Sequence, residues 1–254
     1  MSGVLLPGTA QAPQVLSGYT ASGAGGVGFA GSALPGPTAP YAGIWASVPL
    51  VNNASSPITT ANISLPPGLP DTALVVAVAV ADSEGSGTLS LSDSFATHYT
   101  WTSVASSPSG GYYTTEIFLG TRSGAASSDL VGTVTATFSV TSDTWALAVP
   151  LLGAQGALVT AGNGNGSSSA SGTSMPMGSV STTMTTVMVG VLLAGVNAYY
   201  STPTTPAGSN IIPFNSSNGF FLICPNLAAG TYDPTATTTS STTTDWSSSI
   251  AAFD

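Results

Sequence analysis

Two residues of this chain, Cys224 and His98, are the first to consider for nucleophilic chemistry. The sequence contains one Cys, one His, one Arg and no Lys. A Cys–His dyad needs a thiol with a lowered pKa and a partner that orients the imidazole. Cys224 instead ends the apolar run FFLIC, so we interpret it as a small buried hydrophobic residue. We interpret His98 as an exposed or hydrogen-bonded strand residue, and we predict that the protein is not an enzyme.

Two carboxylates, Glu116 and Asp93, are the remaining candidates for catalysis. A pair of carboxyl groups on either side of a glycosidic bond can hydrolyse it. Glu116 lies in the strand-like segment YTTEIF, and Asp93 lies near a loop. Sandwich-fold hydrolases usually display several acids and aromatic side chains in a cleft, and this sequence does not establish such a pattern. A hydrolytic enzyme is therefore kept as a minor alternative.

The acidic side chains are better suited to calcium binding than to hydrolysis. Asp82, Glu84 and Asp93 flank a Gly/Ser loop and a turn. Calcium prefers carboxylates in turns, aided by carbonyl and hydroxyl oxygens. We name these three residues as the candidate Ca²⁺ site, although no EF-hand pattern is present and solvated turn acids are the alternative interpretation. No other cofactor is predicted.

Glycans are a second candidate ligand or modification. Four sequons place N-linked acceptors at Asn53, Asn62, Asn165 and Asn215. The tyrosine pairs of residues 112–113 and 199–200 follow turn segments and could stack on sugars or form contacts between subunits.

Charge is scarce and unevenly placed along the chain. Only 4% of the 254 residues are charged, and the formal net charge is −9. No charged residue precedes Asp71. An acidic chain without basic patches is unsuited to nucleic acids and to anionic membrane surfaces, which require Lys and Arg. No apolar run approaches the roughly 18 residues of a transmembrane helix, so we predict no membrane span.

The fold is organised around the run TALVVAVAVA at residues 72–81. Its length, Val content and polar boundary indicate a strand buried on both faces. A similar run, TVMVGVLLAG, covers residues 186–195. Short strand-like segments separated by turns continue to the C-terminus, which is typical of a β-sandwich. The further expected strands are residues 58–65, 88–92, 99–104, 112–120, 131–140, 145–152, 211–214, 220–224, 235–244 and 246–253.

Residues 1–57 are rich in Gly and Pro and carry no charge. Prolines oppose long helices and central strands in this region. We predict an extended N-terminal arm that packs on its own domain or donates a strand to a neighbouring subunit, through residues 3–16 or 41–51.

The sandwich, residues 58–254, shows an internal pseudo-duplication. We place its halves at about residues 58–156 and 173–254, separated by a Gly/Ser tract at residues 162–172. The ends correspond best, since DTW before ALAVPLL at Trp145 matches TDW before SSSIAAF at Trp246. We predict an all-β, jelly-roll-like sandwich, with two separate small domains as the alternative.

This strand order and the repeated Trp-led apolar strand resemble the jelly-roll modules of bacterial secreted surface proteins and of phage or virus structural proteins. The resemblance covers about residues 58–254 and transfers no functional residue. It implies a structural role outside the cell or in a virion.

We therefore predict a non-enzymatic structural protein that binds copies of itself to form an extracellular filament, surface layer or virion component. The absence of edge lysines, which normally block strand addition, supports this. N-terminal strand addition and Ca²⁺ bridging are the expected contacts. The alternative is a carbohydrate-binding or adhesive sandwich module that acts as a monomer.

Overall fold

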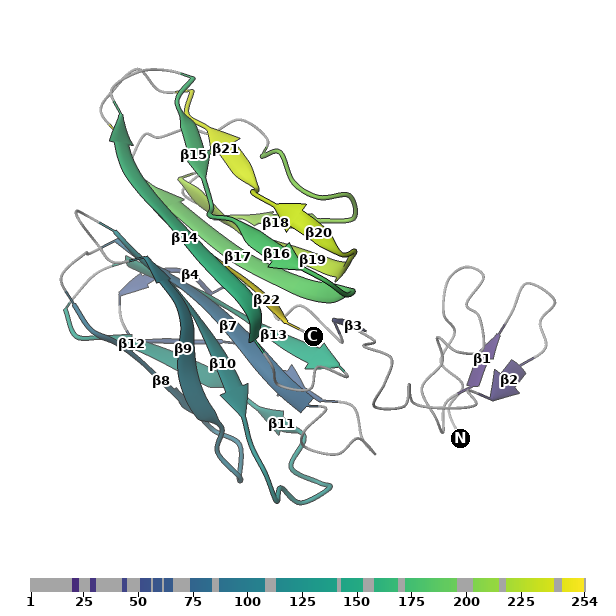
Figure 1. The fold of residues 1–254 in the computed structure, drawn as a ribbon. Helices are drawn as coiled ribbons and strands as arrows, with labels where there is room; N and C mark the ends of the chain where they lie inside the picture. The colour runs from purple at the N-terminus through teal and green to yellow at the C-terminus, as the bar shows by residue number, and fades with distance from the viewer. Residues whose placement is uncertain are drawn as a thin grey trace. The chain divides into compact units, whose positions relative to one another are not determined.

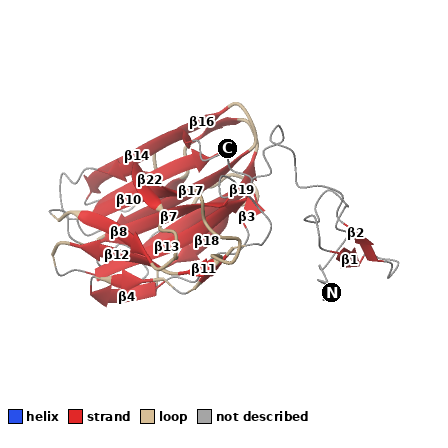
Figure 2. Ribbon diagram, turned by 90° about the horizontal axis from the view of Figure 1, so that it is seen from below, coloured by secondary structure: helices blue, strands red, loops and turns tan. Residues whose placement is uncertain are grey.

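The computed structural model describes residues 20–22, 28–30, 43–44, 51–55, 57–60, 62–65, 74–83, 87–107, 113–140, 143–152, 158–168, 172–195, 203–214, 218–239 and 244–253. Within these ranges every regular element is a β-strand (Figure 2), and every strand pair is antiparallel. The predicted all-β class is confirmed.

The chain divides into two compact units, Met1–Tyr41 and Ala42–Asp254. In the first unit, β1 (Thr20–Ser22) and β2 (Gly28–Ala30) form an antiparallel hairpin. The predicted arm includes this unit and the first two strands of the second. The rest of the arm lies largely outside the described residues, so its role in assembly stays a prediction.

The second unit, Ala42–Asp254, contains the two halves of the sandwich. The first half is built on one large sheet. Its strand order is β3-β13-β7-β10-β9, and β4 also pairs with β13. The bounds are β3 (Gly43–Ile44), β4 (Val51–Ser55), β7 (Leu74–Asp82), β9 (Thr100–Ser107), β10 (Thr114–Thr121) and β13 (Asp143–Leu152). The central run predicted at residues 72–81 is β7, at the centre of this sheet.

Two small sheets complete the first half, with the orders β5-β12-β8 and β11-β6. Their strands are β5 (Ile58–Thr59), β6 (Ile63–Ser64), β8 (Leu89–Asp93), β11 (Val131–Gly132) and β12 (Val134–Phe138). Along its length the chain passes repeatedly between the large sheet and the small ones, as in a jelly-roll-like sandwich.

The second half repeats this plan on a sheet of order β14-β22-β17-β19-β18, with small sheets β15-β21 and β16-β20. The large sheet contains β14 (Leu158–Ser168), β17 (Thr186–Ala194), β18 (Asn210–Pro213), β19 (Gly219–Leu227) and β22 (Thr244–Phe253). The small sheets contain β15 (Ser174–Pro176), β16 (Val180–Thr182), β20 (Gly230–Tyr232) and β21 (Thr235–Thr237).

The pseudo-duplication is confirmed at the level of topology. In the large sheets, β4-β13-β7-β10-β9 corresponds to β14-β22-β17-β19-β18, strand for strand in chain order. The small-sheet pairs β5-β12 and β6-β11 correspond to β15-β21 and β16-β20. Strand β8 has no counterpart in the part of the second half that the structure describes.

Four layers of sheet result from the packing of the two halves (Figure 1). The large sheets face each other across one apolar core, to which β7 contributes Val75 and Ala77 and β17 contributes Val189. The opposite face of β7, with Val76 and Val78, packs under the small sheets of its own half. Both faces of the central strands are therefore buried, which explains their unbroken apolar sequences. Burial contributes about 1.5–3 kcal/mol for each large aliphatic side chain.

The tryptophan correspondence between the halves is wrong by one residue. Trp145 lies opposite Ala81 and packs in the core between the halves. Trp246 lies opposite Ala194 and packs in the outer core of the second half. Side chains alternate between the faces of a strand, so a shift of one residue moves a side chain to the other face. By strand pairing, Ser247 takes the place that Trp145 has in the first half.

The Gly/Ser tract at residues 162–172 does not simply separate the halves. Residues up to Ser168 belong to β14, which pairs with β22 along its length. A Cβ at Gly164 would collide with the carbonyl oxygen of Pro176, and one at Gly166 would collide with the ring of Trp246. Gly164 lets the small-sheet strand β15 approach the β14 backbone closely, Gly166 makes room for the Trp246 ring, and β14 belongs to the large sheet of the second half.

Candidate functional site

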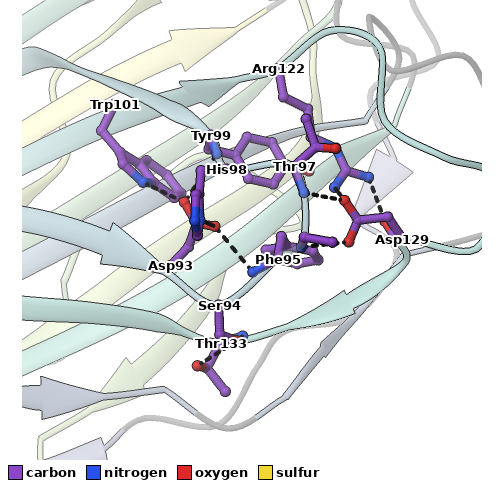
Figure 3. Close-up of polar contacts among 11 residues, drawn as sticks. Asp93, Ser94, Phe95, Thr97, His98, Tyr99, Trp101, Arg122, Asp129 and Thr133 are labelled. Atoms are coloured by element: carbon purple, nitrogen blue, oxygen red, sulfur yellow. Dashed lines mark hydrogen bonds and ion pairs between the residues drawn. The ribbon is translucent and has the colours of Figure 1, made fainter.

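The only Arg and the only His of the chain lie together at the loop between β8 and β9 (Figure 3). Two carboxylates, Asp93 and Asp129, organise this loop, which we call the β8–β9 loop and define as residues 94–99. Asp93 ends β8, and Asp129 lies in the connection between β10 and β11.

Asp93 accepts four hydrogen bonds. Its Oδ1 accepts from the backbone N–H of Phe95 at 3.2 Å and contacts His98 Nδ1 at 3.1 Å. Its Oδ2 accepts from the backbone N–H of Tyr99 at 3.0 Å and from Trp101 Nε1 at 3.1 Å. A carboxylate has about four lone-pair sites. In this arrangement Asp93 is fully engaged by protein donors.

Asp129 forms the second anchor of the loop. It accepts from the backbone N–H groups of Ala96 at 3.0 Å and Thr97 at 2.7 Å. Arg122 donates to the Asp129 carboxylate at 3.2 Å and, through its other terminal nitrogen, to the Asp129 carbonyl at 2.7 Å. The Arg122 and Asp129 side chains are 1% and 5% exposed, so this is a buried ion pair.

Aromatic rings enclose the guanidinium group of Arg122. Its central carbon lies 5.2 Å from the centre of the Phe95 ring and 4.9 Å from that of Tyr99. These two rings also pack edge to face on each other. Cation–π contacts of this kind stabilise a cation that has lost its water.

The pKa of Asp129 lies below its ordinary value. Burial alone would raise this pKa, but the backbone N–H groups of Thr97 and Ala96 and the charge of Arg122 together outweigh that effect. The carboxylate is therefore kept ionised as a structural anchor. The arrangement holds the loop on the sheet edge and leaves neither Arg122 nor Asp129 exposed for a ligand.

The sequence did not reveal the Arg122–Asp129 pair. A buried arginine needs a carboxylate beside it, and the chain has one Arg and ten acids. This charge balance indicated that a buried Arg122 would form an ion pair. It could not name the partner, because several acids of the first half were equally available in sequence.

Cys224 and His98 are not brought together. Cys224 is fully buried in the outer core of the second half, whereas the His98 side chain is 70% exposed in a loop of the first half. Burial raises the pKa of the Cys224 thiol. The interpretation of Cys224 as a small buried residue is confirmed.

Glu116 lies on β10, in the large sheet, and Asp93 lies on β8, in a small sheet. Burial raises the pKa of Glu116, and a hydrogen bond from Ser103 partly opposes this. Because Asp93 already accepts four hydrogen bonds, it is poorly placed to act as a nucleophile or base. A hydrolytic role for this pair stays an untested prediction.

The three candidate calcium ligands have different environments. Asp82 is buried on β7 and accepts a hydrogen bond from Thr144, while Asp93 is engaged as described above. Glu84 lies outside the described residues. Among the residues that the structure describes, no group of three or more His, Cys, Asp or Glu side chains could hold a metal ion. Calcium binding stays a prediction.

The predicted glycosylation sites are also untested. Asn62 is exposed just before β6. Asn53 lies in β4 and Asn165 in β14, and Asn215 lies outside the described residues. Tyr113 is half-buried and packs against the core between the halves, while its neighbour Tyr112 and the pair at residues 199–200 lie outside the described residues.

The edges of the large sheets are the other candidate functional feature. At one side, the edge strands β9 and β14 are tied to each other across the two halves. Asn163 Nδ2 donates to the Ser106 carbonyl at 2.8 Å, and Ser107 Oγ donates to the Gly164 carbonyl at 3.2 Å. These bonds join the edge of the first large sheet to the edge of the second.

The other two edges differ. In the second half the edge strand is β18, which has four residues and ends at Pro213. In the first half, β3 and β4 from the N-terminal region cover the outer edge of β13. Short strands and prolines are devices that protect a sheet edge. The outer edge of β13 is thus completed, within the chain, by two strands of the predicted N-terminal arm.

Comparison with protein-family models, curated proteins and solved structures found no match to this chain. Within the described residues there is also no helix of sufficient length and hydropathy to cross a membrane.

Proposed function

We propose that this chain is a non-enzymatic structural protein that assembles with copies of itself into an extracellular filament, a surface layer or a virion component. The observation that carries the proposal is the location of its basic side chains. Arg122 is buried against Asp129, and His98 contacts Asp93. The chain has no Lys, so no sheet edge has the lysine protection that usually prevents strand addition.

The N-terminal region supports the same proposal. No charge precedes Asp71, so this region can be buried in an assembly without the desolvation of a charged group. Its strands β3 and β4 add to β13 within the chain, which is the contact that strand addition uses between subunits. Each square ångström of apolar surface buried in this way contributes about 25 cal/mol.

Light scattering of the purified full chain, measured over a range of concentrations, tests the proposal. We expect a mass many times that of one chain, increasing with concentration. The measurement is repeated with Ca²⁺ and then with EDTA, because the sequence predicts Ca²⁺ ligation by Asp82, Glu84 and Asp93. Loss of the polymers in EDTA would support ion bridging, and their persistence would reject it.

A mass equal to one chain at every concentration, with and without Ca²⁺, would contradict self-assembly. In that case the carbohydrate-binding module becomes the leading interpretation, and glycan binding by the monomer is its test.

A further inference from the structure

The outer edge of β13 differs from its counterpart in the second half. There, β14 is a continuous strand of eleven residues whose register pairs with β22 from Phe253 to Thr244. In the first half, β4 pairs with Asp143, Thr144 and Ala146, and β3 pairs with Leu151 and Leu152. The same position in the fold is thus filled by two short strands, of five and two residues.

We propose that the outer edge of β13 is a strand-exchange site, where the strands β3 and β4 of a second copy of this chain replace the chain's own. This inference rests on the proposed function and names its contact. Exchange of an identical element between copies re-forms the same contacts and is therefore a low-cost route to association.

The other edges favour this choice. β9 and β14 are tied together by the side chains of Ser107 and Asn163, and β18 is short and ends in a proline. Exchange of β9 or β14 would have to break and re-form these bonds between the halves. Exchange of β3 and β4 leaves the bonds between β9 and β14 in place.

The connections of the segment also suit exchange. β4 ends at Ser55 and β5 begins at Ile58, so only two residues, one of them Pro57, join the large sheet to the small sheet. Short connections of this kind promote swapping between copies. On the other side, β3 begins at Gly43, just after the boundary between the compact units at Tyr41 and Ala42.

Cysteine cross-linking of the full chain tests the exchange. Ser55 lies opposite Asp143 in the register of β4 and β13. Residues directly opposite in antiparallel strands have Cα atoms about 4.5–5.5 Å apart, within the range that a disulfide spans. The variants Ser55→Cys and Asp143→Cys are made separately in a Cys224→Ser background, denatured, mixed, refolded together and oxidised with diamide.

We expect a disulfide-linked species of two chains in the mixture, which disappears on reduction and is much weaker when either variant is refolded alone. The double variant S55C/D143C checks the register within one chain. If it forms only a disulfide within the chain and the mixture gives no linked pair, exchange is overturned. If it forms no disulfide at all, the register itself is absent and the proposal fails as well.

Light scattering on the same samples distinguishes failure of the exchange site from failure of self-assembly. Polymers without the linked pair would overturn the exchange site and leave self-assembly standing. Single chains throughout would overturn the proposed function, and the exchange site with it.

Discussion

The single arginine of the chain stabilises the first half from inside. Its guanidinium group is held by Asp129 and lies over the rings of Phe95 and Tyr99. A buried charge destabilises the fold unless an opposite charge lies beside it. Each member of this pair therefore depends on the other. At the scale of single residues, the burial of Cys224 was predictable from its apolar neighbours. The Arg122–Asp129 pair was not, because it depends on how the β8–β9 loop folds.

Replacing Arg122 by Ala should lower the free energy of unfolding by about 3–5 kcal/mol, since it leaves the Asp129 carboxylate buried without its partner. Denaturant unfolding measures this loss. The control is His98→Ala, whose exposed contact with Asp93 should be worth at most about 1 kcal/mol. Equal effects of the two substitutions would contradict the structural role of Arg122.

Acid should weaken the native state through Asp129. Because the folded pKa of this carboxyl is lower than the unfolded one, its stabilisation is present above the ordinary pKa of 3.8 and is lost as the pH falls through the lowered value. Unfolding measured between about pH 2 and 6 should therefore show a steeper acid loss for the native sequence than for Asp129→Asn. Parallel pH profiles would refute this assignment.

The thiol of Cys224 should not react in the native protein. It is fully buried and its pKa is raised, so little thiolate forms and reagents cannot reach it. Iodoacetamide at pH 8, followed by mass spectrometry, should label the unfolded chain and leave the native chain unlabelled. Rapid labelling of the native chain would show that this core is open.

At the scale of elements, the sequence was most informative where burial was greatest. The strands β7 and β17 were predictable because both of their faces are covered and their sequences are therefore continuously apolar. The strands β15, β16 and β20 were not expected, because three residues are too few for a periodic pattern. Residues 162–172 resemble a separating tract in sequence, because the glycines that β14 needs for close packing are also typical of linkers.

Substitution of Gly164 by Ala tests the close packing of β14. The added Cβ would meet the Pro176 carbonyl, a backbone atom that cannot rotate away. Overpacking of this kind typically costs about 1–3 kcal/mol, which thermal or denaturant unfolding would detect. Thr183→Ala, at an exposed position, is the matched control and should change stability by less than about 0.5 kcal/mol. A neutral Gly164 variant would show that the small sheets are not held against β14.

At the scale of the whole molecule, the duplication could be predicted but its exact alignment could not. The strand order repeats, yet Trp145 and Trp246 point into different cores because their strands differ by one residue in register. Alignment of the two sequences pairs residues of the same type, whereas the structures correspond by the face of the sheet on which each side chain lies. The face-to-face packing of the two large sheets also lay beyond the sequence, since a strand covered on both sides does not indicate which layer covers each side.

The two halves nevertheless form a joint unit, and hydroxyl groups help to align them. Thr115 on β10 contacts Ser249 and Ser247 on β22 at 3.0 and 3.2 Å between side-chain oxygens. At another part of the interface, Trp145 stacks on Phe214. A unit fixed in this way is suited to act as a rigid subunit of the assembly that we propose.

Negative-stain electron microscopy of the purified full chain is the sharpest test of self-assembly. We expect regular filaments, sheets or shells with a repeat that is constant between particles. Fields of uniform single particles of one chain, at concentrations where light scattering is also monomeric, would contradict it.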